Sequence, residues 1–171
     1  ISAITRVHAA FYERNSDPLS WGQTPEKQLE LLGHPSLRPH FPVTNGKLIF
    51  DQCEPPFTAS DSLLGAVKLG VHQRAPVYFG RRVGDYMAIV ETPPVIDQVF
   101  VAALNWRAPR PVVEQLLPKT AFLLRAAYEA TYLAAIAQGS SCLVLTLVGG
   151  GSFANPVEQI VEAIAAAHAT W

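Results

Sequence analysis

Three consecutive glycines followed by small and polar residues are the part of this sequence best suited to bind a ligand. The candidate ligand-binding residues of this segment are Gly149, Gly150, Gly151, Ser152, Phe153, Ala154 and Asn155. Glycine allows a backbone to approach a ligand closely and to expose successive N–H groups. The chemistry that this predicts is the binding of an anion such as a phosphate or diphosphate. A tight turn without a ligand fits the same spacing equally well.

The elements predicted on either side would hold this loop in place. Residues 143–148 form an almost unbroken apolar run, which predicts a strand buried on both faces. Asn155, Pro156 and Glu158 predict an N-cap, a first-turn proline and a capping-box acid, and apolar residues continue at helical spacing to Ala167. The N-terminus of such a helix adds free N–H groups and the positive end of its dipole to the anion site.

Other glycine motifs do not fit. No Gly-Lys-Ser/Thr follows, as a nucleotide P-loop requires, and a Gly-x-Gly-x-x-Gly fingerprint would open the first strand–helix unit, not the last. Ser152 lacks the second glycine of the Gly-x-Ser-x-Gly nucleophile elbow, so a contact to phosphate suits it better than nucleophilic catalysis.

The order strand, glycines, small residue, aromatic residue, small residue, Asn, Pro and helix resembles the second phosphate loop of macrodomains. In that family the loop wraps the diphosphate and distal ribose of ADP-ribose. The long apolar helix before Gly139 is also similar, and the resemblance covers about residues 95–170. The Gly-Gly-Gly-Ser-Phe-Ala-Asn variant is closest to a divergent, bacterial-effector-like branch. The resemblance implies a three-layer α/β/α domain with a mixed sheet, a site for ADP-ribose or a related adenine nucleotide, and no cofactor.

The resemblance also suggests further site residues. Residues 57–66 correspond to the first phosphate loop, with Ser62 as a ligand contact, although an ordinary helix capped by Ser60 or Asp61 explains them as well. Asn105 follows a predicted strand at residues 95–104 and would line the pocket, and Trp106 is better explained by packing.

The activity implied by the resemblance is that of an ADP-ribosyl hydrolase acting on a protein or small molecule. The Asn-Ala-Ala-Asn segment of well-known hydrolytic members is missing, since only Asn45 stands in the corresponding region. A carboxylate could activate water instead, and the candidates are Asp61, Asp85 and Glu91, each of which also fits a cap, turn or strand edge. The alternatives are a non-catalytic ADP-ribose or nucleotide-binding module and an interaction scaffold with a degenerate pocket.

Composition limits the other possibilities. The 171 residues fit one compact unit with only 16% charged residues and a net charge of −1, which predicts neither nucleic-acid nor membrane binding. No apolar run is long enough for a membrane span and no signal peptide is visible, while the first residue is Ile, which indicates processing or truncation. Cys53 and Cys142 are expected to be reduced thiols, and the spacing of the five histidines does not resemble a metal site. We expect the protein to be located in the cytoplasm, or in a host cell after secretion as an effector.

The rest of the chain suggests a helical and proline-rich extension at residues 1–44 and the macrodomain-like domain at residues 45–171, packed as one unit. Helices are expected at residues 1–14, 25–32 and 63–71, and a long helix ending near residue 138. Short strands are expected at residues 47–50, 77–79 and 86–91, the last two as a hairpin.

Overall fold

The computed structural model describes residues 31–44, 47–48, 57–84, 86–107 and 113–171. Its elements in chain order are β1 (Val43–Thr44), β2 (Lys47–Leu48), α3 (Asp61–Leu64), β3 (Gly70–Pro76), β4 (Phe79–Val83), β5 (Tyr86–Ile89), β6 (Val95–Phe100), α4 (Val113–Gln138) and α5 (Val157–Thr170). The helix expected at residues 1–14 lies outside the described residues, as does the helix expected at residues 25–32 except for its last two residues, which form a turn. Within these ranges no helix is long and apolar enough to cross a membrane.

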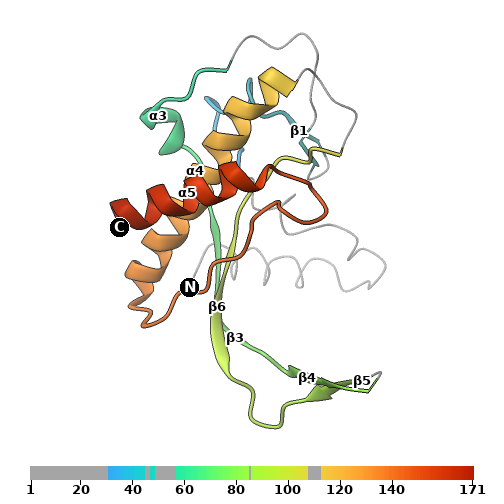
Figure 1. Cartoon of the computed structure of the whole chain (residues 1–171). Coiled ribbons are helices and arrows are strands. Elements are labelled where there is room, and N and C mark those ends of the chain that lie inside the picture. The colour runs from blue at the N-terminus through green and yellow to red at the C-terminus, as the bar shows by residue number, and fades with distance from the viewer. Residues whose placement is uncertain (1–30, 45–46, 49–56, 85, 108–112) are drawn as a thin grey trace.

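Helices and strands occur together, so the broad α/β class is confirmed. The described strands form three antiparallel pairs, β1 with β2, β3 with β6, and β4 with β5. The hydrogen bonds from Val77 N to Pro94 O and from Val90 N to Tyr78 O link the last two pairs, so that β3 to β6 form one long bent ribbon. This ribbon extends away from the helices (Figure 1).

The ribbon bends at a bulge on β3. The pairing register shifts between His72 and Ala75, and Arg74 has a φ of 55°. The backbone N–H of Arg74 donates a 2.7 Å hydrogen bond to Oδ1 of Asp97 on β6. The Asp97 carboxylate therefore accepts from a backbone donor that the bulge has displaced from the regular ladder.

Three sequence predictions for the ribbon need correction. The helix expected at residues 63–71 ends at Leu64, and β3 begins at Gly70. Gly65 and Gly70 lower the helix propensity of this segment, and pairing with β6 then decides its conformation. The strand expected at residues 95–104 ends at Phe100. The antiparallel pairing of the expected hairpin is confirmed, but its first strand, expected at residues 77–79, is β4 at Phe79–Val83.

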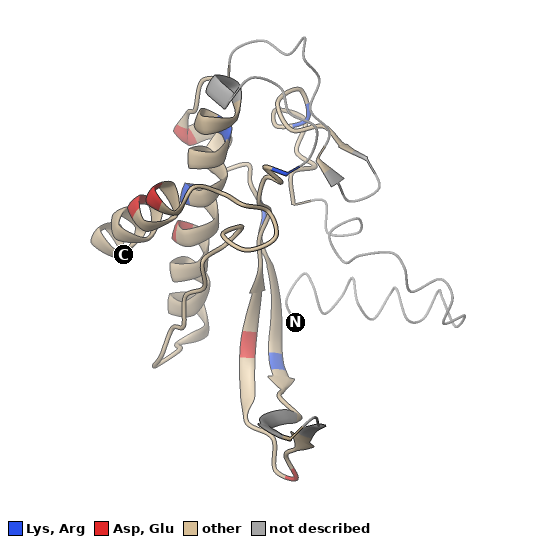
Figure 2. Ribbon diagram, turned by 45° about the vertical axis from the view of Figure 1, so that its right-hand side comes forward, with Lys and Arg blue, Asp and Glu red and all other residues tan. Residues whose placement is uncertain are grey.

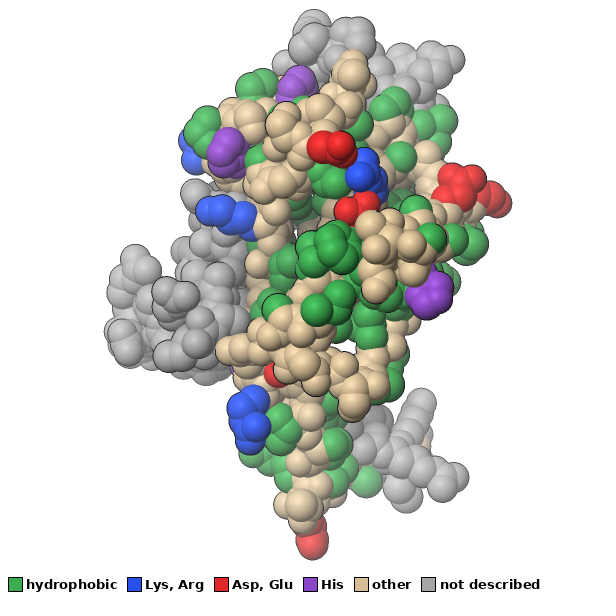
Figure 3. Space-filling view, turned by 90° about the vertical axis from the view of Figure 1, so that its left-hand side faces the viewer, with side chains coloured by type: hydrophobic (Ala, Val, Ile, Leu, Met, Phe, Trp, Pro, Cys, Tyr) green, Lys and Arg blue, Asp and Glu red, His purple; other side chains and the backbone are tan. Residues whose placement is uncertain are grey.

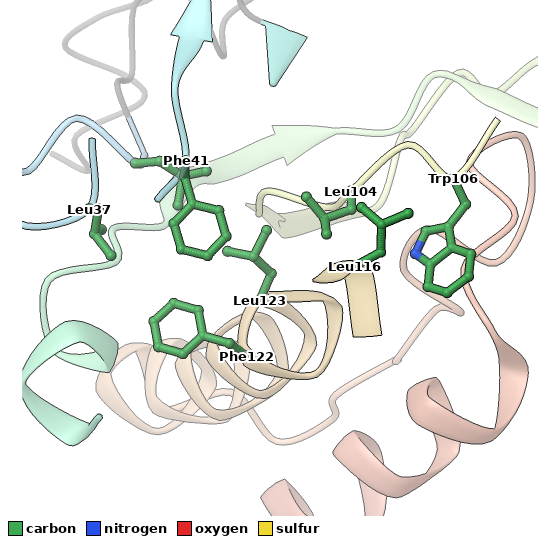
Figure 4. Close-up of a cluster of buried hydrophobic side chains, with 8 residues drawn as sticks. Leu37, Phe41, Leu104, Trp106, Leu116, Phe122 and Leu123 are labelled. Atoms are coloured by element: carbon green, nitrogen blue, oxygen red, sulfur yellow. The ribbon is translucent and has the colours of Figure 1, made fainter. Parts of the chain in front are cut away.

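Two hydrophobic clusters pack against α4. The first lies along its N-terminal half and contains Leu104, Trp106, Leu116, Phe122 and Leu123 together with side chains of the turn at residues 31–41 (Figure 4). In this cluster the Phe41 and Phe122 rings stack with centroids 5.6 Å apart. The second lies between α4 and α5 and contains Leu124, Tyr128, Ile160, Ala163 and Ala167. Both helices were expected from their apolar spacing, and both are confirmed.

The apolar run after α4 differs from its prediction. Residues 143–148 are extended but are not paired as a strand with any described residue. Leu145 and Val148 pack against the cluster between α4 and α5, while Val144 is 80% exposed and Leu147 56% exposed. The prediction of a strand buried on both faces is therefore wrong, because only one face lies on the helices. Cys142 is exposed, not buried, and has no disulfide partner among the described residues.

Candidate functional site

The glycine loop, residues 149–155, is built from two successive turns. Gly150 N donates to Leu147 O at 2.9 Å, and Ala154 N donates to Gly151 O at 3.0 Å. A third bond from Asn155 N to Gly149 O, at 2.9 Å, closes the loop. The chain thus leaves the extended segment, folds back on itself and enters α5 within a few residues (Figure 1).

The buried side chain of Asn155 connects the two ends of this loop with Leu104. Its side chain is buried, and its Nδ2 donates to Leu104 O at 2.7 Å and to Gly149 O at 3.2 Å. Its Oδ1 is buried and has no hydrogen-bond partner within the described residues. The prediction that Asn155 caps α5 is wrong: the N-cap is Pro156, and no side chain caps the helix. The side chain of Asn155 instead donates to the carbonyl oxygen of Leu104, because that residue is buried in the first hydrophobic cluster and leaving its oxygen without a donor would cost more than leaving the helix uncapped.

Two loop positions have a left-handed backbone. Gly149 has a φ of 73°, and a Cβ there would lie 2.6 Å from Nδ2 of Asn155, so only glycine fits. Ala154 has a φ of 55°, which is uncommon for a residue with a Cβ. The backbone conformation and the contact with Asn155 at position 149 explain why the loop begins with a glycine.

The outer part of the loop presents backbone donors. The N–H groups of Gly151, Ser152 and Phe153 make no hydrogen bond within the described residues, and all three residues are exposed. A Cβ added at Gly151 would meet no atom within 4 Å, so the space in front of this position is open. The loop itself carries no charged side chain (Figure 2). Successive free N–H groups beside a helix N-terminus can bind an anion.

The structure brings Asn105 to the loop. Trp106 N donates to Phe153 O at 2.8 Å, which places the residues around Trp106 against the loop's outer part. Asn105 is exposed, and its Oδ1 accepts from Arg107 N at 3.0 Å. Trp106 is buried in the first cluster, and its Nε1 donates to Thr120 Oγ1 at 2.9 Å, so the packing role expected for Trp106 is confirmed.

The other predicted site residues lie elsewhere. Ser60 is the N-cap of α3, its Oγ accepting from Leu63 N, and Ser60 Oγ lies 3.0 Å from Ser62 Oγ. Asp61 begins α3 and lies 3.3 Å from Nη1 of Arg125 on α4. Among the described residues, no hydrogen bond or ion pair connects α3 with the glycine loop, and the two lie on opposite sides of α4 in Figure 1. Glu91 is exposed in a bend, and Asp85 lies outside the described residues.

Asp61 borders a shallow hollow between α3 and α4. This hollow has a volume of about 340 Å³, an apolar floor that includes Leu64 and Leu133, and a rim of Asp61, Arg125 and Glu129. Figure 3 shows this face, where acidic and basic side chains lie next to a hydrophobic area. Arg125 Nε donates to Glu129 at 2.7 Å, and this bond, with the charges of Glu129 and Asp61, raises the pKa of Arg125. The charges of the rim are therefore paired with one another.

Tyr128 supports the segment that leads into the loop. Its side chain is buried, and its hydroxyl donates to Thr146 O at 2.7 Å and accepts from Val148 N at 3.0 Å. Burial raises the pKa of Tyr128, and the bond from Val148 N opposes this shift. Helical spacing predicted its burial but gave no sign of this double contact, which depends on how α4 packs.

Within the described ranges, no three His, Cys, Asp or Glu side chains are grouped as metal ligands would be. No protein-family model, curated protein or solved structure matches this chain.

Proposed function

We propose that the glycine loop binds ADP-ribose or a related adenine nucleotide, and that the chain is a macrodomain-like ADP-ribose-binding protein. The observation that carries this proposal is the row of three successive N–H groups at Gly151, Ser152 and Phe153, which make no hydrogen bond within the described residues and shortly precede the N-terminus of α5, which no side chain caps. Such a row is suited to the oxygens of a phosphate. Asn155 supports this row from behind, since its buried side chain donates to Gly149 O and Leu104 O and so fixes the start of the loop.

The three-layer arrangement with a mixed sheet is part of this proposal. The chain runs from β6 through α4 to the extended residues 143–148 and then α5, which is the order of a strand–helix–strand–helix unit. Bonds from Asn155 to Leu104 O and from Trp106 N to Phe153 O join the ends of the two extended segments. Neighbouring parallel strands have their carboxyl ends at one edge, where ligands of α/β sheets bind. These contacts place the glycine loop against the residues that follow β6, and this chain order is what supports the three-layer proposal, since residues 143–148 are paired with no described strand.

Hydrolysis of an ADP-ribosyl bond is the second candidate function. It requires a carboxylate that can orient or deprotonate water near the distal ribose. Asp61 is engaged with Arg125 on the other side of α4, whereas Glu158 is exposed in the first turn of α5, three residues after Asn155. Glu158 is therefore the described carboxylate best placed for this role.

Calorimetric titration with ADP-ribose tests the binding proposal, with AMP and ribose 5-phosphate as controls. We expect micromolar binding of ADP-ribose and much weaker binding of either fragment, because each fragment contains only part of the ligand. No heat from ADP-ribose at concentrations up to about a millimolar would rule out the proposed function, since the binding free energy would then be weaker than about −4 kcal/mol. If ADP-ribose binds, release of ADP-ribose from a modified protein separates a hydrolase from a binding module.

A further inference from the structure

We propose that Arg107 supplies the positive charge of this site and that it selects a ligand with two adjacent phosphates over one with a single phosphate. The inference rests on the proposed function and names a binding residue that the glycine motif does not contain.

The backbone places Arg107 next to the loop. Trp106 N donates to Phe153 O at 2.8 Å, and Arg107 is the following residue, with its Cα about 3.8 Å from that of Trp106. The bond from Arg107 N to Asn105 Oδ1 closes a local turn that fixes the direction in which the chain leaves Trp106. The long side chain of Arg107 therefore starts close to the free N–H groups of the loop.

The charge of Arg107 is available to a ligand. Arg107 is exposed, and the described residues offer it no acidic partner. Arg125 is a useful contrast, since Glu129 and Asp61 both pair with its guanidinium. An arginine can also donate two parallel hydrogen bonds to phosphate oxygens, which a lysine cannot do.

A positive charge beside the loop would favour a diphosphate over a single phosphate. The N-terminus of a helix contributes the equivalent of about half a positive charge. Glu158 in the first turn of α5 adds a negative charge beside it. Backbone donors thus offset only part of the negative charge of a diphosphate, and a cation beside them would strengthen its binding more than that of a single phosphate. Arg107 is the cation that the described hydrogen bonds bring to the loop.

The test is a calorimetric titration of the wild type, Arg107→Gln and Arg107→Lys with ADP-ribose and with AMP. Lys68→Gln is the matched control, because Lys68 is exposed and its loss removes the same charge elsewhere. We expect Arg107→Gln to weaken ADP-ribose binding by about 10- to 100-fold and AMP binding by less than about threefold. Arg107→Lys should lie between, and Lys68→Gln should match the wild type. Thermal unfolding of each variant checks that Arg107 is not needed for folding.

Other results would overturn the inference. Unchanged ADP-ribose binding in Arg107→Gln, or equal losses for ADP-ribose and AMP, would show that Arg107 does not recognise the second phosphate. Equal losses in Lys68→Gln would show a general effect of net charge. A wild type that binds neither ligand would overturn the proposed function itself, which separates that failure from a failure of Arg107 alone.

Discussion

The side chain of Asn155 joins two parts of the chain that lie 51 residues apart, since its Nδ2 donates a 2.7 Å hydrogen bond to the carbonyl oxygen of Leu104. The same nitrogen donates to Gly149 O at 3.2 Å. One amide group therefore fixes the glycine loop both to itself and to the end of the segment that follows β6. Asn155 and Leu104 are both buried, so water cannot replace the bond between them when it is lost.

Asn155→Ala should lower the free energy of unfolding by about 1–3 kcal/mol, because it leaves the Leu104 carbonyl oxygen buried without a donor. Urea unfolding measures this change. Asn105→Ala removes an exposed amide of the same size and should cost less than about 1 kcal/mol. Equal losses in the two variants would show that the buried contact of Asn155 has no special role.

Tyr128→Phe should also destabilise the chain by about 1–3 kcal/mol, because it leaves Thr146 O without its donor and Val148 N without its acceptor. Since the pKa of Tyr128 is raised in the folded state, the unfolded chain loses this proton first as the pH rises. Stability should therefore fall above about pH 10 in the wild type, more steeply than in Tyr128→Phe. Urea titrations from pH 8 to pH 11 compare the two, and parallel pH profiles would contradict the assignment.

Gly151→Leu should abolish ADP-ribose binding with little effect on stability, because a Cβ there meets no atom within 4 Å and the leucine side chain would stand on the residue that begins the row of N–H groups proposed to bind phosphate. Gly150 is less useful for this test, since a Cβ there would lie 3.1 Å from Ile160 and disturb the packing. Ser141→Leu adds the same side chain at an exposed position outside the loop and should bind normally. Calorimetry and thermal unfolding of both variants are needed, and full binding by Gly151→Leu would exclude this loop as the site.

Asp61→Asn should leave ADP-ribose binding unchanged and alter stability by less than about 1 kcal/mol, because the Asp61–Arg125 contact is exposed and connects α3 with α4, away from the loop. Glu158→Gln is the comparison for catalysis, and a loss of ADP-ribose release in that variant alone would identify the carboxylate that activates water. A loss in Asp61→Asn alone would restore the first-loop assignment of residues 57–66.

Local patterns in the sequence predicted those parts of the fold that local interactions determine. The apolar spacing of α4 and α5 was sufficient to predict both helices, and the existence of the hairpin of β4 and β5 was predicted although its first strand was placed too early, because helices and hairpins are formed by near neighbours. The bend of β3 at Arg74 depends on Asp97 across the ribbon, and periodicity does not reveal such a partner.

The site shows the same division between local and distant contacts. The three consecutive glycines between an apolar run and a helical pattern identified the loop. The resemblance to macrodomains suggested Asn105, which lies beside the loop. The role of Asn155 was assigned to the helix cap, since a capping pattern is local and the Leu104 carbonyl oxygen is not. Arg107 and Tyr128 were not identified as contributors because their positions depend on packing between segments far apart in sequence.

The extended residues 143–148 have a consequence for how this chain behaves in solution. Within the described residues the N–H groups of 143–147 make no hydrogen bond, and Val144 and Leu147 are exposed. A strand edge of this kind is a template on which another copy can pair, and heating would bring such edges together while the rest of the chain loosens. Precipitation would then compete with refolding, and an apparent melting temperature would depend on heating rate and concentration. Urea at micromolar protein concentration is therefore the better route to the equilibrium stability of this chain.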